Sequence, residues 1–107
     1  MQSIQVSAIR PLRVGGIYLP SNVLMAPLAG YTCYPFRMLA YELGAGLCFT
    51  EMCSANALKY KDRATNRLLV TTADEPVRAV QLLGGSPAVM ERMAESAFLR
   101  DFDIIDI

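Results

Sequence analysis

The sequence has no histidine and no excess of charge of either sign. Ten basic and ten acidic residues cancel, so the overall balance points neither to nucleic acid nor to an acidic membrane surface. The three cysteines, Cys33, Cys48 and Cys53, form no C-x-x-C pair, and without histidine they do not complete a zinc site. We therefore expect no bound metal.

Long apolar runs are also missing. No stretch approaches the roughly 20 apolar residues that a membrane helix needs. The N-terminal residues, which include Arg10, Pro11 and Arg13, lack the unbroken apolar run of a signal peptide. We expect no membrane span and a reduced, cytoplasmic environment. The chain does have 53% hydrophobic residues, which suits a packed globular core.

Short apolar runs predict a hairpin and four strands. The stretch LRVGGIYL, residues 12–19, has the two-residue hairpin signal at Gly15 and Gly16. The stretch NVLMAP is continuously apolar up to Pro27, which predicts a strand buried on both faces. The four predicted strands cover residues 22–27, 46–52, 77–84 and 102–107.

Helical periodicity appears twice between these strands. A short amphipathic helix is predicted near Pro35, with an apolar stripe formed by Phe36, Leu39, Ala40 and Leu43 and with Gly44 just after its end. A second helix is predicted to begin at Ser86 as N-cap and Pro87 as first residue. Its apolar stripe contains Val89, Met90, Met93, Ala94, Ala97 and Phe98.

The order of elements indicates an α/β fold with parallel strands and helical crossovers. Both the doubly wound sheet and the eight-stranded barrel have this order, and both place their binding loops at the carboxyl ends of the strands. A complete barrel usually needs about 250 residues, so 107 residues correspond to a part of one. The end of the strand at Pro27 is therefore a candidate site.

Four ordered blocks then carry a resemblance to a known family. The blocks APLAGYT.YPFR, ELGAGL.FTEMCSANAL, EP.RAVQLLG and DIIDI resemble the consecutive opening blocks of the tRNA-dihydrouridine synthases, from about Asn22 to Ile107. The resemblance implies an enzyme that reduces uridine to 5,6-dihydrouridine in tRNA, with FMN as cofactor and NADPH as reductant. It also implies a C-terminal helical domain that supplies most of the tRNA contacts.

On this resemblance, residues 1–107 are a partial FMN-binding catalytic domain. They would form the N-terminal portion of a TIM (β/α)8 barrel, with about four βα units and an N-terminal hairpin, truncated after the fourth strand. The family's catalytic cysteine lies in an Asn-x-Gly-Cys-Pro stretch that directly follows that strand, which places it beyond Ile107. The chain alone is therefore expected to be inactive.

Two places match the family's flavin contacts. Pro27, Leu28 and Ala29 correspond to a flavin-contacting turn, in which Pro-Met-Ala is usual. Gln81 corresponds to a glutamine whose amide faces the flavin ring. Independently of the family, an amide in a buried strand must have its hydrogen bonds satisfied, either by a pyrimidine-like edge or by neighbouring backbone.

Several conspicuous residues have no assigned role. Glu51 ends the second strand, where either an orienting group or a solvated strand end fits. Cys48 is interpreted as a small core residue and Cys53 as a bystander. Cys33 stands where the family usually has an aspartate, so Thr32 is expected to cap the helix instead.

Two further features are also left open. Asp103 and Asp106 fall on opposite faces of the last strand, without assigned roles. The segment KYKDRATNR, Lys59–Arg67, follows the second strand and collects four basic residues around one tyrosine. It is interpreted as a solvated helical loop whose charge is offset by Asp62 and Glu75, and at most as a secondary RNA contact.

Two alternatives to the leading interpretation remain. One is another FMN-dependent barrel oxidoreductase that acts on a small substrate. The other is a non-catalytic half-barrel that self-associates through its unpaired strand edges.

Overall fold

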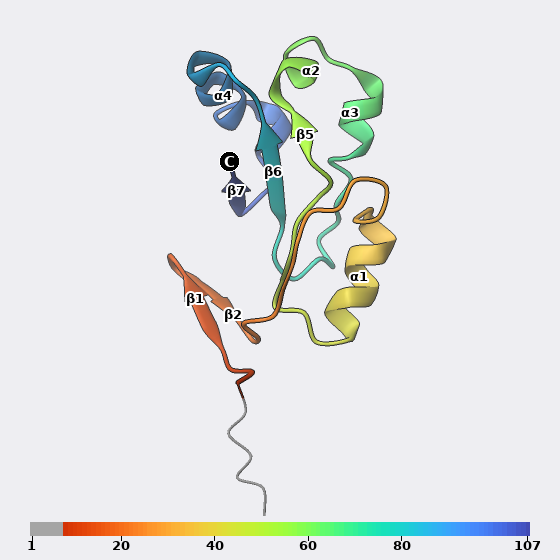
Figure 1. Ribbon diagram of the computed structural model, residues 1–107, viewed down its shortest axis with the longest axis vertical. Helices are drawn as coiled ribbons and strands as arrows, with labels where there is room; N and C mark the ends of the chain where they lie inside the picture. The colour runs from red at the N-terminus through yellow and green to blue at the C-terminus, as the bar shows by residue number, and fades with distance from the viewer. Residues whose placement is uncertain (1–7) are drawn as a thin grey trace, which may run out of the picture.

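The computed structural model describes residues 8–107 and begins with a β-hairpin (Figure 1). Strands β1 (Leu12–Val14) and β2 (Ile17–Leu19) pair antiparallel. Gly15 takes the left-handed conformation, with φ of +58°, that a tight two-residue turn requires. The predicted hairpin is confirmed.

The rest of the chain alternates parallel strands with helices. Two strands, β3 (Leu24–Met25) and β4 (Leu47–Cys48), pair with each other, and α1 (Tyr34–Glu42) connects them. Three more strands pair in the order β5 (Cys53–Ser54), β6 (Ala79–Leu83) and β7 (Ile104–Asp106). A single parallel bridge between Phe49 and Ala79 joins the two groups. The α/β class with parallel strands is confirmed.

Helices connect the strands of the second group. Two short helices, α2 (Ala55–Lys59) and α3 (Arg63–Arg67), lie between β5 and β6. Helix α4 (Pro87–Ala94) and the 3₁₀ helix η1 (Ala97–Leu99) lie between β6 and β7. In Figure 1 the arrows of β5 and β6 point towards the end of the molecule that carries α2 and α4, and the hairpin lies at the other end.

Apolar side chains form two buried clusters. The larger one lies between α2, α4 and the second group of strands, and contains Leu58, Val80, Leu82, Met93 and Leu99 among others. The smaller one joins the hairpin to the first residues of the sheet through Leu19, Leu47, Val77 and Ala79. Burial of these side chains, at about 1.5 to 3 kcal/mol each, fixes the strand ends relative to one another.

The expectation that residues 22–27 form a strand buried on both faces is wrong. Val23 and Leu24 are 47% and 44% exposed. Among the described strands β3 pairs with β4 alone, and both side chains line an apolar cavity instead of packing in a buried cluster. The apolar run indicated a strand correctly but did not indicate how it is covered.

The expectation that the apolar stripe of α1 is its buried side is also wrong. Leu39 and Leu43 are 53% and 80% exposed, whereas Arg37 on the opposite side of the helix is buried. A buried ion pair and a buried tyrosine hydroxyl determine which side of α1 faces the sheet, and neither follows from hydrophobic periodicity. Helix α1 itself and its end before Gly44 agree with the prediction.

The second predicted helix begins as expected and ends early. The Ser86 hydroxyl accepts a hydrogen bond from the Val89 N–H, and Pro87 is the first residue of α4. The helix stops at Ala94, and η1 follows. The tighter 3₁₀ turn changes the phase of the side chains, so Leu99 is buried in place of Phe98.

Candidate functional site

The turn that follows β3 is held by its own hydroxyl group. The Thr32 hydroxyl accepts a hydrogen bond from the Leu28 N–H at 3.1 Å and donates one to the Leu28 carbonyl at 3.2 Å. The same carbonyl accepts the N–H groups of Tyr31 and Thr32, both at 3.0 Å. The turn is therefore rigid, while Leu28 and Ala29 remain exposed on it. The expectation that Thr32 caps α1 is wrong, because this hydroxyl is engaged within the turn and Cys33 occupies the N-cap.

Glu51 connects this turn to the neighbouring strand. Its carboxylate accepts a hydrogen bond from the N–H of Gly30, which has a φ of +79°. The Thr50 hydroxyl beside it donates to the Glu51 carbonyl at 2.9 Å and accepts from the Gln81 N–H at 3.4 Å. A continuous set of contacts thus links the turn after β3 to β6. This hydrogen bond favours an orienting role for Glu51 over a solvated strand end.

Gln81 lies in the middle of β6 and pairs with Asp106 of β7. The two residues are opposite each other in the parallel register, and the Gln81 amide nitrogen donates to the Asp106 carboxylate at 2.7 Å. Asp106, which had no role assigned from sequence, therefore orients the Gln81 amide. Within residues 8–107 the carbonyl oxygen of that amide has no hydrogen-bond partner, and Gln81 is half-buried. It is available as an acceptor.

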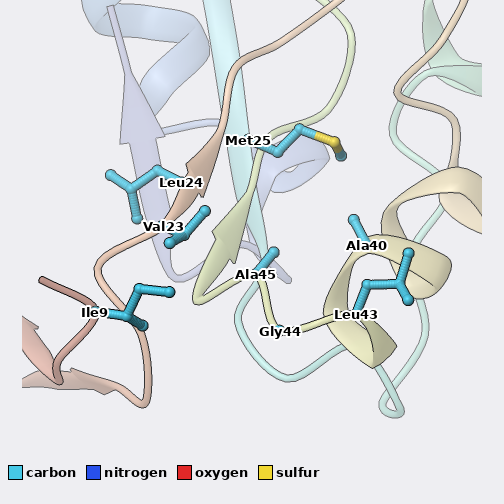
Figure 2. A pocket seen from close by; sticks show the side chains of 8 residues that line it. All are labelled: Ile9, Val23, Leu24, Met25, Ala40, Leu43, Gly44 and Ala45. Carbon is cyan, nitrogen blue, oxygen red and sulfur yellow. The ribbon is translucent and has the colours of Figure 1, made fainter. Parts of the chain in front are cut away.

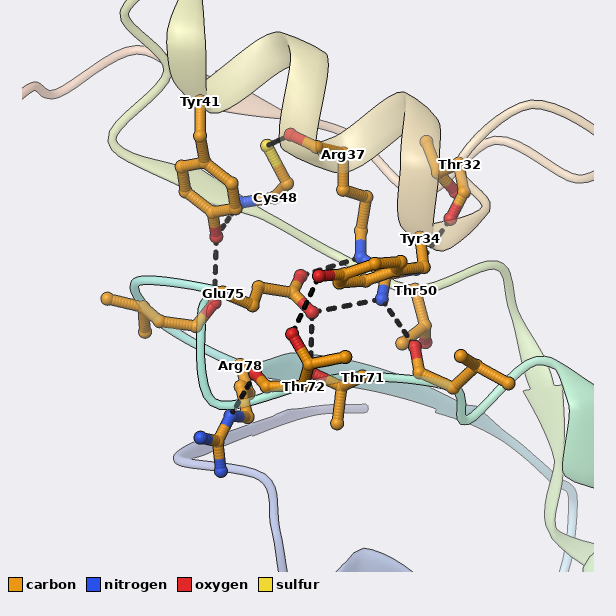
Figure 3. A network of polar contacts seen from close by, with 12 residues as sticks. Thr32, Tyr34, Arg37, Tyr41, Cys48, Thr50, Thr71, Thr72, Glu75 and Arg78 are labelled. Carbon is orange, nitrogen blue, oxygen red and sulfur yellow. Dashed lines mark hydrogen bonds and ion pairs between the residues drawn. The ribbon is translucent and has the colours of Figure 1, made fainter.

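A buried ion pair joins Arg37 of α1 to Glu75 next to the turn after β3 (Figure 3). Arg37 Nε donates to Glu75 at 2.7 Å, and both side chains are 1% exposed. The same guanidinium donates to the carbonyls of Thr32 and Val70, each at 2.8 Å. Glu75 also accepts the Thr71 hydroxyl at 2.6 Å. The pair joins the turn after β3 to the segment that leads into β6.

A tyrosine hydroxyl extends this network along α1. The Tyr41 hydroxyl donates to the Val77 carbonyl at 2.8 Å and accepts from the Cys48 N–H at 2.9 Å. Burial raises the pKa of Tyr41 well above its ordinary value. The hydroxyl therefore stays protonated and serves as a structural bridge between β4 and the segment just before β6. The sequence did not predict this network, although Arg37 among the apolar residues of α1 was a usable signal; Glu75 lies in a polar stretch and gave none.

The cysteines do not form a reactive group. Cys48 and Cys53 are fully buried, and burial raises the pKa of each thiol to about 11. A protonated, inaccessible thiol is a poor nucleophile and a poor proton donor to an external substrate. The interpretation of Cys48 as a core residue is confirmed, and the burial of Cys53 supports the interpretation of it as a bystander. Cys33 is exposed at the start of α1.

The basic segment Lys59–Arg67 contains α3, whose start is capped by a side chain. Asp62 caps α3 by accepting the Thr65 N–H at 3.0 Å and the Thr65 hydroxyl at 2.7 Å, and these bonds lower the pKa of Asp62. The expected offset of the basic charge by Glu75 is wrong, because Glu75 is buried against Arg37.

An apolar cavity of about 580 Å³ lies away from these polar groups (Figure 2). It is located where β3 begins and α1 ends, which is the amino-terminal side of the strands, and its lining is almost entirely hydrocarbon. The lining residues are Ile9, Val23, Leu24, Met25, Ala40, Leu43, Gly44 and Ala45. Such a cavity offers no polar group to orient a substrate, so the turn after β3 and Gln81 are the better candidate site.

Two kinds of feature are absent from residues 8–107. No helix in this part of the chain is long and apolar enough to cross a membrane. No group of three or more histidine, cysteine, aspartate or glutamate side chains there is arranged to hold a metal ion.

Comparison with known proteins gives a consistent result. The family model for dihydrouridine synthase (Dus) matches residues 24–107. The chain is 34% identical over 96 residues to tRNA-dihydrouridine synthase B of Pseudomonas aeruginosa, which covers 90% of this chain and 29% of that protein. It is 39% identical over 97 residues to tRNA-dihydrouridine synthase B of Salmonella typhimurium, again over 90% of this chain and 30% of the relative. The chain thus spans about 30% of the length of these curated relatives. No solved structure shows significant similarity to it.

Proposed function

The chain belongs to the dihydrouridine synthase family, and on that premise we propose that it takes part in the reduction of uridine to 5,6-dihydrouridine in tRNA, with FMN as cofactor and NADPH as reductant. In this proposal the parallel strands β3 to β7 are the opening part of a (β/α)8 barrel. The observation that carries the proposal is the match of the family over residues 24–107, where the turn after β3 and Gln81 are connected by hydrogen bonds.

The donor and acceptor groups at the site suit a flavin. Within the described residues the backbone N–H of Ala29 has no hydrogen-bond partner, and the side-chain amide oxygen of Gln81 has none either. One is a donor and the other an acceptor, and the pyrimidine-like edge of a flavin alternates both kinds of group. We assign Pro27, Leu28, Ala29 and Gln81 to flavin binding. Asp106, Glu51 and Thr32 hold these groups in place.

The chemistry divides between the flavin and a proton donor. Bound FMN would supply hydride to one carbon of the uracil 5,6 double bond, and an acid must supply a proton to the other. Cys48 and Cys53 do not provide this acid, because both thiols are fully buried. We assign the acid to the family's cysteine, which the resemblance places in an Asn-x-Gly-Cys-Pro stretch after the strand that corresponds to β7; residues 1–107 contain no such stretch. In this proposal residues 8–107 contribute part of the flavin contacts, through Pro27, Leu28, Ala29 and Gln81.

The proposal is tested with the natural gene product that carries this chain. We expect it to form dihydrouridine in unmodified tRNA when FMN and NADPH are supplied, as measured by mass spectrometry of the digested tRNA. NADPH oxidation that depends on an added small unsaturated substrate under anaerobic conditions, without dihydrouridine in any tRNA, would instead indicate a flavin oxidoreductase with a small substrate.

A second comparison isolates the role of the 107 residues. We expect residues 1–107 alone to form no dihydrouridine, whereas a chimera joined to the remaining part of the Pseudomonas aeruginosa relative forms it. Product from residues 1–107 alone would contradict the assignment of the acid to a cysteine outside this chain.

A further inference from the structure

The basic segment Lys59–Arg67 is a concentration of unpaired positive charge in a chain with no net charge. Its four basic side chains are all exposed: Lys59, Lys61, Arg63 and Arg67. Within residues 8–107 the one ion pair is that of Arg37 and Glu75, so none of the four has a carboxylate within 4.0 Å. Asp62 lies among them, but its carboxylate is engaged by Thr65 at the start of α3. The charge is therefore available to an external anion.

An exposed aromatic ring stands in the middle of this charge. Tyr60 is 77% exposed, and the Lys59 ammonium lies 5.5 Å from the centroid of its ring. A ring of this size that contacts a cation and leaves a face open to solvent is the kind of platform on which nucleic-acid bases stack. Its position next to four cations is what distinguishes it from a scattered surface tyrosine.

The backbone holds this corner in a fixed conformation. Lys61 has a φ of +56°, which is unfavourable for a residue with a side chain, and its N–H donates to the Leu58 carbonyl at 2.9 Å. Leu58 is fully buried in the larger apolar cluster, and the Ser54 hydroxyl caps α2 by accepting the Ala57 N–H. The corner between α2 and α3 is thus anchored to the core.

The segment also lies at the carboxyl ends of β5 and β6, the end at which the substrate would bind. Helix α2 begins directly after β5, and β5 pairs with β6, which carries Gln81. Figure 1 shows α2 and α3 at the end towards which β5 and β6 point. A polynucleotide whose base approaches the carboxyl ends of these strands would pass close to the segment.

We propose that the basic segment is an RNA-contacting surface, on which Tyr60 stacks with an unpaired base and the four cations contact the adjacent phosphates. This inference rests on the proposed function, because it takes tRNA as the ligand. Phosphate contacts supply affinity without sequence preference, and stacking tolerates any base, so the surface would position the tRNA rather than select a sequence.

The test measures binding of unmodified tRNA by the natural gene product at several salt concentrations. Removing three cations, in Lys59→Ala/Lys61→Ala/Arg63→Ala, is expected to lower the slope of log affinity against log salt by about 2 to 3 and to weaken binding at least tenfold. Tyr60→Ala is expected to weaken binding about tenfold with little change of slope, and Tyr60→Phe to retain it.

The hairpin supplies a matched control. Arg13 lies 5.9 Å from the ring centroid of Tyr18, which is 54% exposed, at the opposite end of the molecule. Arg13→Ala/Tyr18→Ala likewise removes a cation and the exposed tyrosine ring beside it. This variant is expected to leave the tRNA affinity and its salt slope unchanged.

The outcomes separate this inference from the proposed function. An unchanged slope in the triple variant, or an equal loss in the hairpin control, overturns the inference. A wild-type protein that forms no dihydrouridine but binds tRNA with a slope that falls in the triple variant contradicts the proposed function and leaves the RNA surface supported.

Discussion

Breaking the buried ion pair of Arg37 and Glu75 is expected to destabilise the protein severely. The change Arg37→Met removes the guanidinium but keeps an unbranched apolar side chain in its place. Glu75, at 1% exposure, then retains the Thr71 hydroxyl as its remaining partner, and the carbonyls of Thr32 and Val70 lose their donor.

The magnitude follows from this loss of partners. Leaving one charge of a buried pair unpaired costs about 3 to 5 kcal/mol. Each carbonyl that loses its donor adds a further penalty of about 1 kcal/mol or more, although these terms do not add fully. Since domains of this class are stable by about 5 to 15 kcal/mol, we expect a loss of at least about 4 kcal/mol.

The assay is urea unfolding of the natural gene product followed by circular dichroism. The double change Arg37→Met/Glu75→Leu removes both charges and is expected to be more stable than the sum of the two single changes, by about 3 kcal/mol. Arg37→Lys serves as a milder variant if Arg37→Met does not fold. A loss below about 1 kcal/mol in Arg37→Met, or full additivity in the double variant, would refute the reasoning.

Two further predictions concern packing and thiol chemistry. Gly46→Ala places a methyl group against the backbone carbonyl of Ser21, so we expect a lower unfolding temperature, whereas Gly16→Ala, with open space at the same position, should leave it nearly unchanged. Near pH 8 we expect iodoacetamide to modify Cys33 in the folded protein and to spare the two buried cysteines, because burial raises the pKa of each to about 11. The buried thiols should begin to react at neutral pH when the protein is unfolded in urea, and peptide mass spectrometry would show this. Equal labelling of all three cysteines in the folded protein would contradict the burial of Cys48 and Cys53.

The sequence predicted those parts of the fold that depend on local signals. The hairpin at Gly15 and the start of α4 at Ser86 and Pro87 follow from turn and capping chemistry, which involves only neighbouring residues. The order of strands follows from the alternation of apolar runs, except at residues 46–52, where one strand was predicted and the structure has β4 and then β5 at Cys53–Ser54 in a different group. The burial of α1 could not be predicted in this way, because it depends on an ion pair between residues that are 38 positions apart.

The candidate site shows the same division. The turn at Pro27 and the position of Gln81 came from the resemblance and from the apolar strands around them. The contacts that hold them, from Asp106 to Gln81 and from Glu51 to Gly30, join residues 25 and 21 positions apart. Such pairs form only when the strands are in register, and register is a property of the folded sheet rather than of any single segment.

The most direct test of the central claim is the affinity of the natural gene product for FMN when Gln81 is changed. Gln81→Leu keeps a similar volume and removes the side-chain oxygen proposed to accept a hydrogen bond from the flavin edge, at a cost of roughly 1 to 3 kcal/mol. Fluorescence titration should therefore show FMN binding weakened by about one to two orders of magnitude. Leu83→Met on the same strand, where Leu83 is 51% exposed, is the control and should bind as the wild type does. FMN binding that is unchanged in Gln81→Leu would contradict the account and return Gln81 to a purely structural role beside Asp106.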